Sequence, residues 1–119
     1  MPALSPAAFN IGVACTDAHL HTPRANQTAM IVVDERGDVQ RATYAELAAS
    51  SSRFAQTLAA LDIAAGARIM IRLPNSLDYP TAFLGALKAS AIAVPISPQL
   101  TGDELAYLAA DAGASALVT

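Results

Sequence analysis

One cysteine and few positive charges limit what this chain can be. The single cysteine, Cys15, excludes an internal disulfide and fits the reducing cytoplasm, where we expect the protein to reside. Seven Lys and Arg residues against ten Asp and Glu residues leave a net charge of -3, which argues against a nucleic-acid-binding surface. The N-terminus lacks a basic region followed by an apolar core, so no secretory signal is predicted. No uncharged run reaches transmembrane length, because Lys88 interrupts the most apolar stretch, and we expect no membrane span.

The few glycines do not form a phosphate-binding loop. All six stand singly, and neither G-x-G-x-x-G nor G-x-x-x-x-G-K-[ST] occurs in the sequence. Only 14% of the 119 residues are charged and 54% are hydrophobic, which is apolar for a free-standing domain. Alanine richness is one explanation, and a surface that lacks its partner is another. The second explanation predicts that the isolated chain associates with itself.

The most organised part of the sequence is Ala67–Pro98. An apolar run at Ile69–Ile71 is followed by a turn at Pro74–Ser76, a helix-length segment with apolar periodicity, and a second apolar run at Ala91–Ile96. This order predicts a β-strand, a crossover helix and a parallel β-strand. Both apolar runs are continuous, so we expect both strands to be covered on both faces.

The flanking segments predict further elements. Apolar runs at 29–33 and 39–42 enclose a polar, glycine-containing turn, which is typical of a β-hairpin. A short helix is expected over 11–20. After the central stretch, a second T-x-x-E spacing opens a helix over 101–113, and a last strand follows at 115–119.

The clearest helix is predicted over 43–61. Thr43 and Glu46 have the spacing of a capping box, in which each side chain accepts a hydrogen bond from the other residue's backbone amide. Four apolar side chains fall on one face of this helix, namely Leu47, Phe54, Leu58 and Leu61. Asp62 follows the last of them, and we expect it to adopt a left-handed conformation.

Together these elements predict an α/β fold. It consists of a β-hairpin followed by a βαβαβ-type, largely parallel, three-layer unit. We expect residues 1–119 to form a single partial domain. Within it, 1–28 form an N-terminal arm and short helix, 29–42 the hairpin, and 43–119 the α/β unit.

The pattern of residues near the N-terminus does not predict a metal site or a nucleophile. Asp17, His19 and His21 lie close together, but no further ligand is at hand to complete a metal site, so we interpret them as a polar helix end. Cys15 has no neighbour that would lower the pKa of its thiol, which favours a buried or half-buried structural cysteine over a nucleophile.

The charged residues further along have structural interpretations as well. Asp34, Glu35 and Asp38 could bind a cation or perform acid–base work, but their place in a hairpin turn favours a solvated loop. Arg68 and Arg72 flank a predicted strand and could contact phosphates. A salt bridge at the rim of the sheet is the role we favour for them.

The two ends of the crossover helix, and the start of the helix over 43–61, carry residues that could have a function. Pro74–Ser76 follows a strand and opens this helix, which is where α/β sheets bind ligands and helix amides attract anions. Without a glycine-rich loop, we interpret Asn75 or Ser76 as a structural helix cap, with Asp78 and Pro80 in the first turn. Tyr44 is interpreted as a packing residue, and Lys88 as a solvated residue near the end of the helix.

Several motifs, in this order and spacing, resemble the N-terminal part of the adenylate-forming superfamily of AMP-dependent synthetases and ligases. They read T-Y-A-E-L at 43–47, R-L-P-N-S at 72–76, A-F-L-G-A-L-K at 82–88, and L-K-A-S-A-I-A-V-P at 87–95. The likeness continues through L-T at 100–101 and E-L at 104–105 to L-V-T at 117–119, and weakly includes F-N-I at 9–11. Asp62 and Ser90 stand where the family usually has Gly, which concerns local backbone geometry.

The resemblance implies that the whole protein is an acyl-CoA synthetase-like ligase. Such an enzyme uses ATP and magnesium to convert a carboxylic acid into an acyl-adenylate, and then transfers the acyl group to CoA or another thiol. The family's phosphate-binding loop and catalytic lysine lie further along than Thr119. The resemblance therefore implies no catalytic, cofactor-binding or metal-binding residue in this chain, which we expect to be inactive alone. A non-catalytic small α/β binding or interaction module is the alternative.

Overall fold

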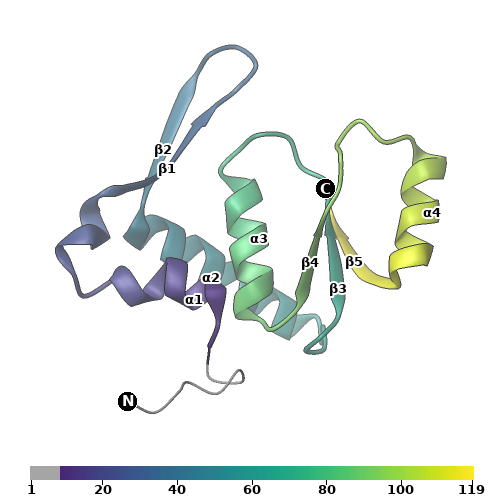
Figure 1. Ribbon diagram of the computed structural model, residues 1–119, viewed down its shortest axis with the longest axis horizontal. Helices are drawn as coiled ribbons and strands as arrows, with labels where there is room; N and C mark the ends of the chain where they lie inside the picture. The colour runs from purple at the N-terminus through teal and green to yellow at the C-terminus, as the bar shows by residue number, and fades with distance from the viewer. Residues whose placement is uncertain (1–8) are drawn as a thin grey trace.

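The computed structural model describes residues 9–119 (Figure 1). Its helices and 3₁₀ turns are α1 (Ile11–Cys15), η2 (Asp17–His19), η3 (Pro23–Asn26), α2 (Tyr44–Ala60), α3 (Asp78–Lys88) and α4 (Gly102–Ala112). Its strands are β1 (Thr28–Val33), β2 (Val39–Thr43), β3 (Arg68–Ile71), β4 (Ile92–Pro95) and β5 (Ala114–Val118). The strands form an antiparallel pair, β1–β2, and a parallel sheet in the order β4-β3-β5. The predicted fold class is confirmed, while the arm at residues 1–8 lies outside the described residues.

Parallel strand β3 forms the centre of the core. Ile69, Met70 and Ile71 are each 1% exposed or less. In Figure 1, α3 lies on one side of the sheet, packed on α2, and α4 lies on the other, which confirms the three layers. The expectation that both strands of the crossover are fully covered was correct for β3 only. β4 is at the edge of this sheet, and Ile92 remains 46% exposed.

Helix α2 begins as the sequence predicts. The Glu46 amide donates to Thr43 Oγ1 at 3.1 Å, and the Thr43 amide donates to Glu46 Oε2 at 3.2 Å, which completes the capping box. Leu58, on its apolar face, is buried. The inclusion of Leu61 in this face was wrong: the helix ends at Ala60, and Leu61 is 65% exposed because the chain turns away there.

Close approach of α2 and α3 depends on Gly85. A Cβ atom at this position would lie 2.7 Å from Phe54 Cδ1 and 2.7 Å from the Ser51 carbonyl oxygen. Such distances are not tolerated between real atoms, so any larger residue would force the helices apart. The contact allows Leu58 of α2, Ala86 of α3 and the central strand to share one core cluster.

Two helices differ from the sequence predictions. Helix α3 begins at Asp78, and Leu77, in a right-handed conformation, replaces Asn75 or Ser76 at the N-cap and offers no side-chain bond. The helix expected over 11–20 is interrupted at Thr16, whose hydroxyl donates to the Gly12 carbonyl at 2.6 Å. Such a bond to the preceding turn bends helices.

The T-x-x-E spacing at the start of α4 forms only half of a capping box. The Glu104 amide donates to Thr101 Oγ1 at 3.3 Å, as predicted. The Glu104 carboxylate, however, accepts from the Thr101 hydroxyl at 2.9 Å rather than from its backbone amide. Gly113 ends the helix with a φ of 64°, as expected for a left-handed C-terminal residue.

Candidate functional site

The carboxyl ends of β3 and β5 are the natural place to look for a site. From β3 the chain crosses through α3 to β4 on one side, and from β4 it crosses through α4 to β5 on the other side. The strand order therefore reverses between β3 and β5. In open α/β sheets, ligands bind outside the carboxyl ends of strands at such a reversal.

Arg72 lies at this reversal. Its backbone amide donates to the Val118 carbonyl at 2.8 Å, and its Nη2 donates to the Leu100 carbonyl at 3.0 Å. Its Nε is buried and has no hydrogen-bond partner among residues 9–119. The side chain thus holds the loop between β4 and α4 over the end of the sheet.

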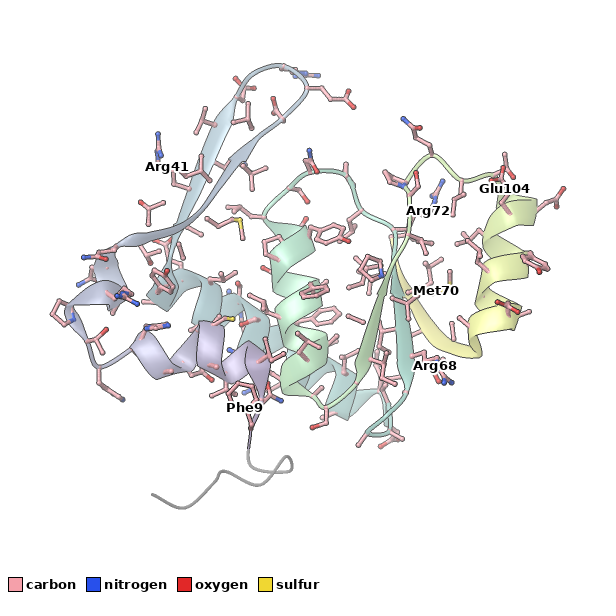
Figure 2. All side chains as sticks on the ribbon, viewed as in Figure 1. Phe9, Arg41, Arg68, Met70, Arg72 and Glu104 are labelled. Atoms are coloured by element: carbon pink, nitrogen blue, oxygen red, sulfur yellow. The ribbon has the colours of Figure 1, made fainter. Side chains whose placement is uncertain are left out.

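The interpretation of Arg68 and Arg72 as rim salt-bridge residues was wrong. Figure 2 shows them at opposite ends of β3, and the one ion pair found within residues 9–119 joins Lys88 to Asp17. Arg68 is exposed, while Arg72 takes a backbone carbonyl as its acceptor because the loop before α4 folds onto it.

The turn at Pro74–Ser76 does not cap α3 with a side chain. Ser76 Oγ donates to the Pro74 carbonyl at 3.3 Å, and the N-cap residue, Leu77, makes no side-chain hydrogen bond. A hollow of about 630 Å³ beside Pro74 and Asn75 is also lined by Asp34, Glu35 and Arg36 of the hairpin turn. Two carboxylates against one guanidinium leave this lining with a net negative charge, which disfavours phosphate.

The hairpin turn is built by one of its carboxylates. Asp34 Oδ1 accepts from the amides of Arg36 and Asp38, both at 2.9 Å. Gly37 provides the positive φ, at 84°, that the turn requires. Asp34, Glu35 and Asp38 are all exposed, so the interpretation of these three residues as a solvated loop is confirmed.

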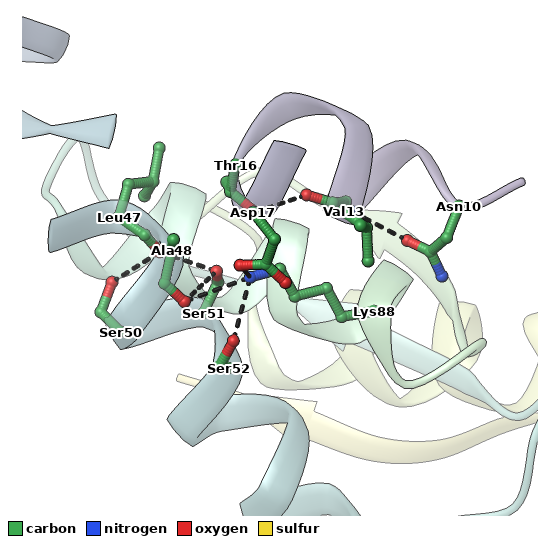
Figure 3. Close-up of polar contacts among 11 residues, drawn as sticks. Asn10, Val13, Thr16, Asp17, Leu47, Ala48, Ser50, Ser51, Ser52 and Lys88 are labelled. Atoms are coloured by element: carbon green, nitrogen blue, oxygen red, sulfur yellow. Dashed lines mark hydrogen bonds and ion pairs between the residues drawn. The ribbon is translucent and has the colours of Figure 1, made fainter. Parts of the chain in front are cut away.

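Lys88 is the most strongly coordinated side chain of the described region (Figure 3). Its Nζ donates to Asp17 Oδ1 at 3.0 Å, to the Ala48 carbonyl at 3.1 Å and to Ser52 Oγ at 3.1 Å. Its side chain is only 5% exposed, so the prediction of a solvated residue was wrong. The end of α3 packs between α2 and the N-terminal turns, which excludes water from the ammonium group.

The geometry gives Lys88 a structural role. An ammonium group has three donors, and all three are used within the fold. The lysine therefore joins η2, α2 and α3, and it has no donor left for a substrate. Asn10 adds a parallel link, since its Nδ2 donates to the Leu87 carbonyl at 2.7 Å.

The N-terminal candidates do not form a reactive centre. No group of three His, Cys, Asp or Glu side chains that could hold a metal is found in the part of the chain the structure describes. His19 packs on Tyr44 with ring centroids 4.9 Å apart, which confirms the packing role of Tyr44. Cys15 is exposed, contrary to the expectation of a buried or half-buried thiol, because the residues that this segment buries are Gly12 and Thr16.

The described residues offer few groups that could hold ATP and magnesium. Within residues 9–119 there is no cluster of acidic ligands, and the only lysine of the sequence is fully engaged. Arg72 lies at the carboxyl edge of β3, and part of its donor set is already used. No helix among residues 9–119 has the length and apolar character needed to cross a membrane.

Comparison with known proteins identifies the family that this chain matches. The family model for AMP-binding enzymes matches residues 18–119. Long-chain-fatty-acid–CoA ligase FadD13 of Mycobacterium tuberculosis is 38% identical over 78 residues, which cover 66% of this chain and 16% of the ligase. The chain thus spans about a sixth of that relative's length.

Solved structures also match this chain. The crystal structure of the N-terminal domain of FACL13 from Mycobacterium tuberculosis matches with a TM-score of 0.73 and 34% identity, over 91% of this chain and 26% of that one. An acyl-CoA synthetase from Brucella canis has a TM-score of 0.84 and 22% identity over 93% of this chain and 20% of its own, a likeness of fold. The chain belongs to the AMP-binding enzyme family.

Proposed function

We propose that this chain is the N-terminal scaffold portion of an ATP-dependent carboxylic acid–CoA ligase. The observation that carries the proposal is the match over residues 18–119 to the AMP-binding family, together with the CoA-ligase relative. The complete enzyme would join a carboxylic acid to ATP with release of pyrophosphate, and would then pass the acyl group to CoA. We further propose that it works in the cytoplasm, in keeping with its single cysteine.

In this proposal the residues of the chain position other parts of the ligase. The Lys88 network fixes the N-terminal turns against α2 and α3, and Arg72 holds the loop before α4 on the carboxyl edge of the sheet. When bound elsewhere in the ligase, ATP and magnesium would supply the activated phosphate. No step is assigned to them on residues 9–119, since these residues offer few groups that could hold them.

A chimera tests the scaffold role. Residues 18–119 replace the matching region of the M. tuberculosis CoA ligase, and acid- and ATP-dependent acyl-CoA formation is measured. We expect the chimera to retain activity, and the same chimera with Gly85→Leu to lose it because α2 and α3 can no longer approach. A folded chimera without activity would contradict the proposal.

A further inference from the structure

A hollow of about 450 Å³ lies between β1 and the N-terminal half of α3. It is lined on one side by four consecutive residues of β1, Met30–Val33, and on the other by Tyr79, Pro80 and Phe83. Successive side chains of a strand point to opposite faces, so a cavity that touches four in a row lies along the strand's edge as well as on one face. The hollow therefore follows the outer edge of β1.

The backbone of β1 faces this hollow with unused hydrogen-bonding groups. In antiparallel pairs, residues alternate between facing the partner strand and facing outward. The Asp34 amide donates to the Asp38 carbonyl at 3.0 Å, which sets the phase of the alternation. Val32 then faces β2, while Ile31 and Val33 direct their amide and carbonyl groups to the outer edge. Both are 54% exposed, and the sheet has only two strands.

The apolar lining of the hollow and the unpaired backbone groups of β1 together favour an extended strand as the occupant of the hollow. A purely hydrocarbon ligand would fill the apolar lining but would bury the outward amides of β1 without acceptors, which is unfavourable. An added strand would pair those amides and place alternate side chains on α3. Natural edge strands are protected by charges or proline, whereas Thr28–Val33 has neither, and β2 carries Arg41.

Strand β1 of another copy of the chain fits this description. It is uncharged and apolar after Thr28, and the hairpin that holds it projects away from the helices (Figure 1). We propose that a second copy of this chain docks by antiparallel pairing of the two β1 strands about a two-fold axis at Ile31. The result is a four-stranded sheet, β2-β1-β1-β2, with α3 of each copy beneath the strands of the other.

Charge complementarity supports the second copy as occupant. Pairing centred on Ile31 sets residue 27 of one copy opposite residue 35 of the other. The turn that carries Asp34, Glu35, Arg36 and Asp38 has a net negative charge, and it then lies beside η3 of the other copy, which carries Arg24. Arg24 and Glu35 are both exposed, and neither forms an ion pair within residues 9–119. The arrangement is isologous, as closed dimers are.

A matched pair of proline variants tests the interface by sedimentation of the 119-residue chain. Val33 and Val39 lie opposite each other on β1 and β2, are 54% and 51% exposed, and both direct their amides outward. Proline is tolerated at such edge positions. We expect the wild type and Val39→Pro to sediment near 24 kDa, about twice the chain mass of 12.2 kDa, and Val33→Pro to be at least about tenfold weaker in dimerisation. A monomeric wild type, or equal behaviour of the two variants, would overturn the proposal.

A cross-linking experiment covers the case in which a proline variant fails to fold. In a Cys15→Ser background, Ile31→Cys places two thiols across the two-fold axis, at a Cα separation of about 5.5 Å that a disulfide can span. We expect rapid oxidation to a covalent dimer. Arg41→Cys, on the opposite edge of the same hairpin, is the control and should stay monomeric under oxidation. Cross-linking of both variants alike, or of neither, would overturn the proposed pairing.

Discussion

Within residues 9–119, two residues other than glycine adopt left-handed backbone conformations: Asp62, with a φ of 57°, and Ser90, with a φ of 61°. The expectation for Asp62 is confirmed, and Ser90 behaves alike. Both stand where the resembling family usually has Gly. This conformation strains most residues with a Cβ atom, although Asp tolerates it better than most. The chain therefore accepts a small local cost at two helix ends.

Replacing these residues by glycine should remove the strain. We expect Asp62→Gly to be neutral or slightly stabilising, and Ser90→Gly to raise the free energy of unfolding by up to about 1 kcal/mol. Gly113→Ala, at a φ of 64°, is the reverse control and should lower it by a similar amount. Urea denaturation of the three variants measures these differences. Marked destabilisation by Ser90→Gly would contradict the strain argument.

Replacing Asp17 and replacing Lys88 should lower the free energy of unfolding by different amounts. The lysine side chain is 5% exposed, while that of Asp17 is 33% exposed. Asp17→Ala leaves a buried ammonium without a counter-charge, and should cost about 3 kcal/mol. Lys88→Met leaves a carboxylate that water can reach, and should cost less, about 1–2 kcal/mol. Denaturation midpoints test the order, and a larger loss for Lys88→Met would refute this account.

At the scale of elements, the cap of α2 can be tested within the helix itself. Thr43→Ala removes the acceptor for the Glu46 amide and should lower the free energy of unfolding by about 1 kcal/mol. Thr57→Ala is the matched control, since Thr57 is exposed in the helix interior and its hydroxyl only donates to the Arg53 carbonyl. Alanine is the better helix former there, so this variant should be neutral or stabilising. Equal melting temperatures for the two variants would count against the cap.

Elements that depend on neighbours in the sequence could be predicted, and those that depend on distant contacts could not. The Thr43–Glu46 cap, the hairpin and the parallel crossover follow from spacing and apolar runs, which act within a few residues. The start of α3 was misplaced because three residues, Asn, Ser and Asp, all favour helix caps in sequence, and only the loop geometry decides among them.

In the candidate site too, the features that depend on distant contacts could not be predicted from the sequence. Lys88 was misread because its acceptors, on Asp17, Ala48 and Ser52, are at least 36 residues away in the sequence. The signal that could have found it is a lone lysine in an otherwise apolar helix end. The acceptor of Arg72, the Leu100 carbonyl, is set by a loop 28 residues away, and no local pattern reports it.

At the scale of the whole molecule, the sheet is covered unequally. Helix α4 buries none of its residues, Tyr107 is 70% exposed, and Leu117 of β5 is 42% exposed. The other face, under α3, holds the core cluster. An apolar composition and a half-covered sheet are consistent with a chain that spans about a sixth of the length of a related ligase.

We expect the 119-residue chain to catalyse no acid-dependent ATP–pyrophosphate exchange. We also expect it to bind ATP with magnesium no tighter than the millimolar range. Stabilising the charge that develops on the phosphates requires aligned amides, cations and a metal held by carboxylates or hydroxyls. The six glycines stand singly, and the ammonium of the only lysine is fully bonded inside the fold. At the carboxyl edge of β3, Arg72 offers a guanidinium with one donor already bonded and another buried.

Titration calorimetry with ATP and magnesium and a pyrophosphate-exchange assay measure both expectations, with the M. tuberculosis CoA ligase as the positive control. Arg72→Met provides the internal comparison, because this variant removes the guanidinium at the carboxyl edge of β3. It should leave any weak nucleotide signal unchanged if that signal is unspecific. Micromolar binding that Arg72→Met abolishes would show instead that the phosphates are held at the reversal of strand order, since that is where Arg72 lies. The chemistry would then have to be assigned to this part of the ligase.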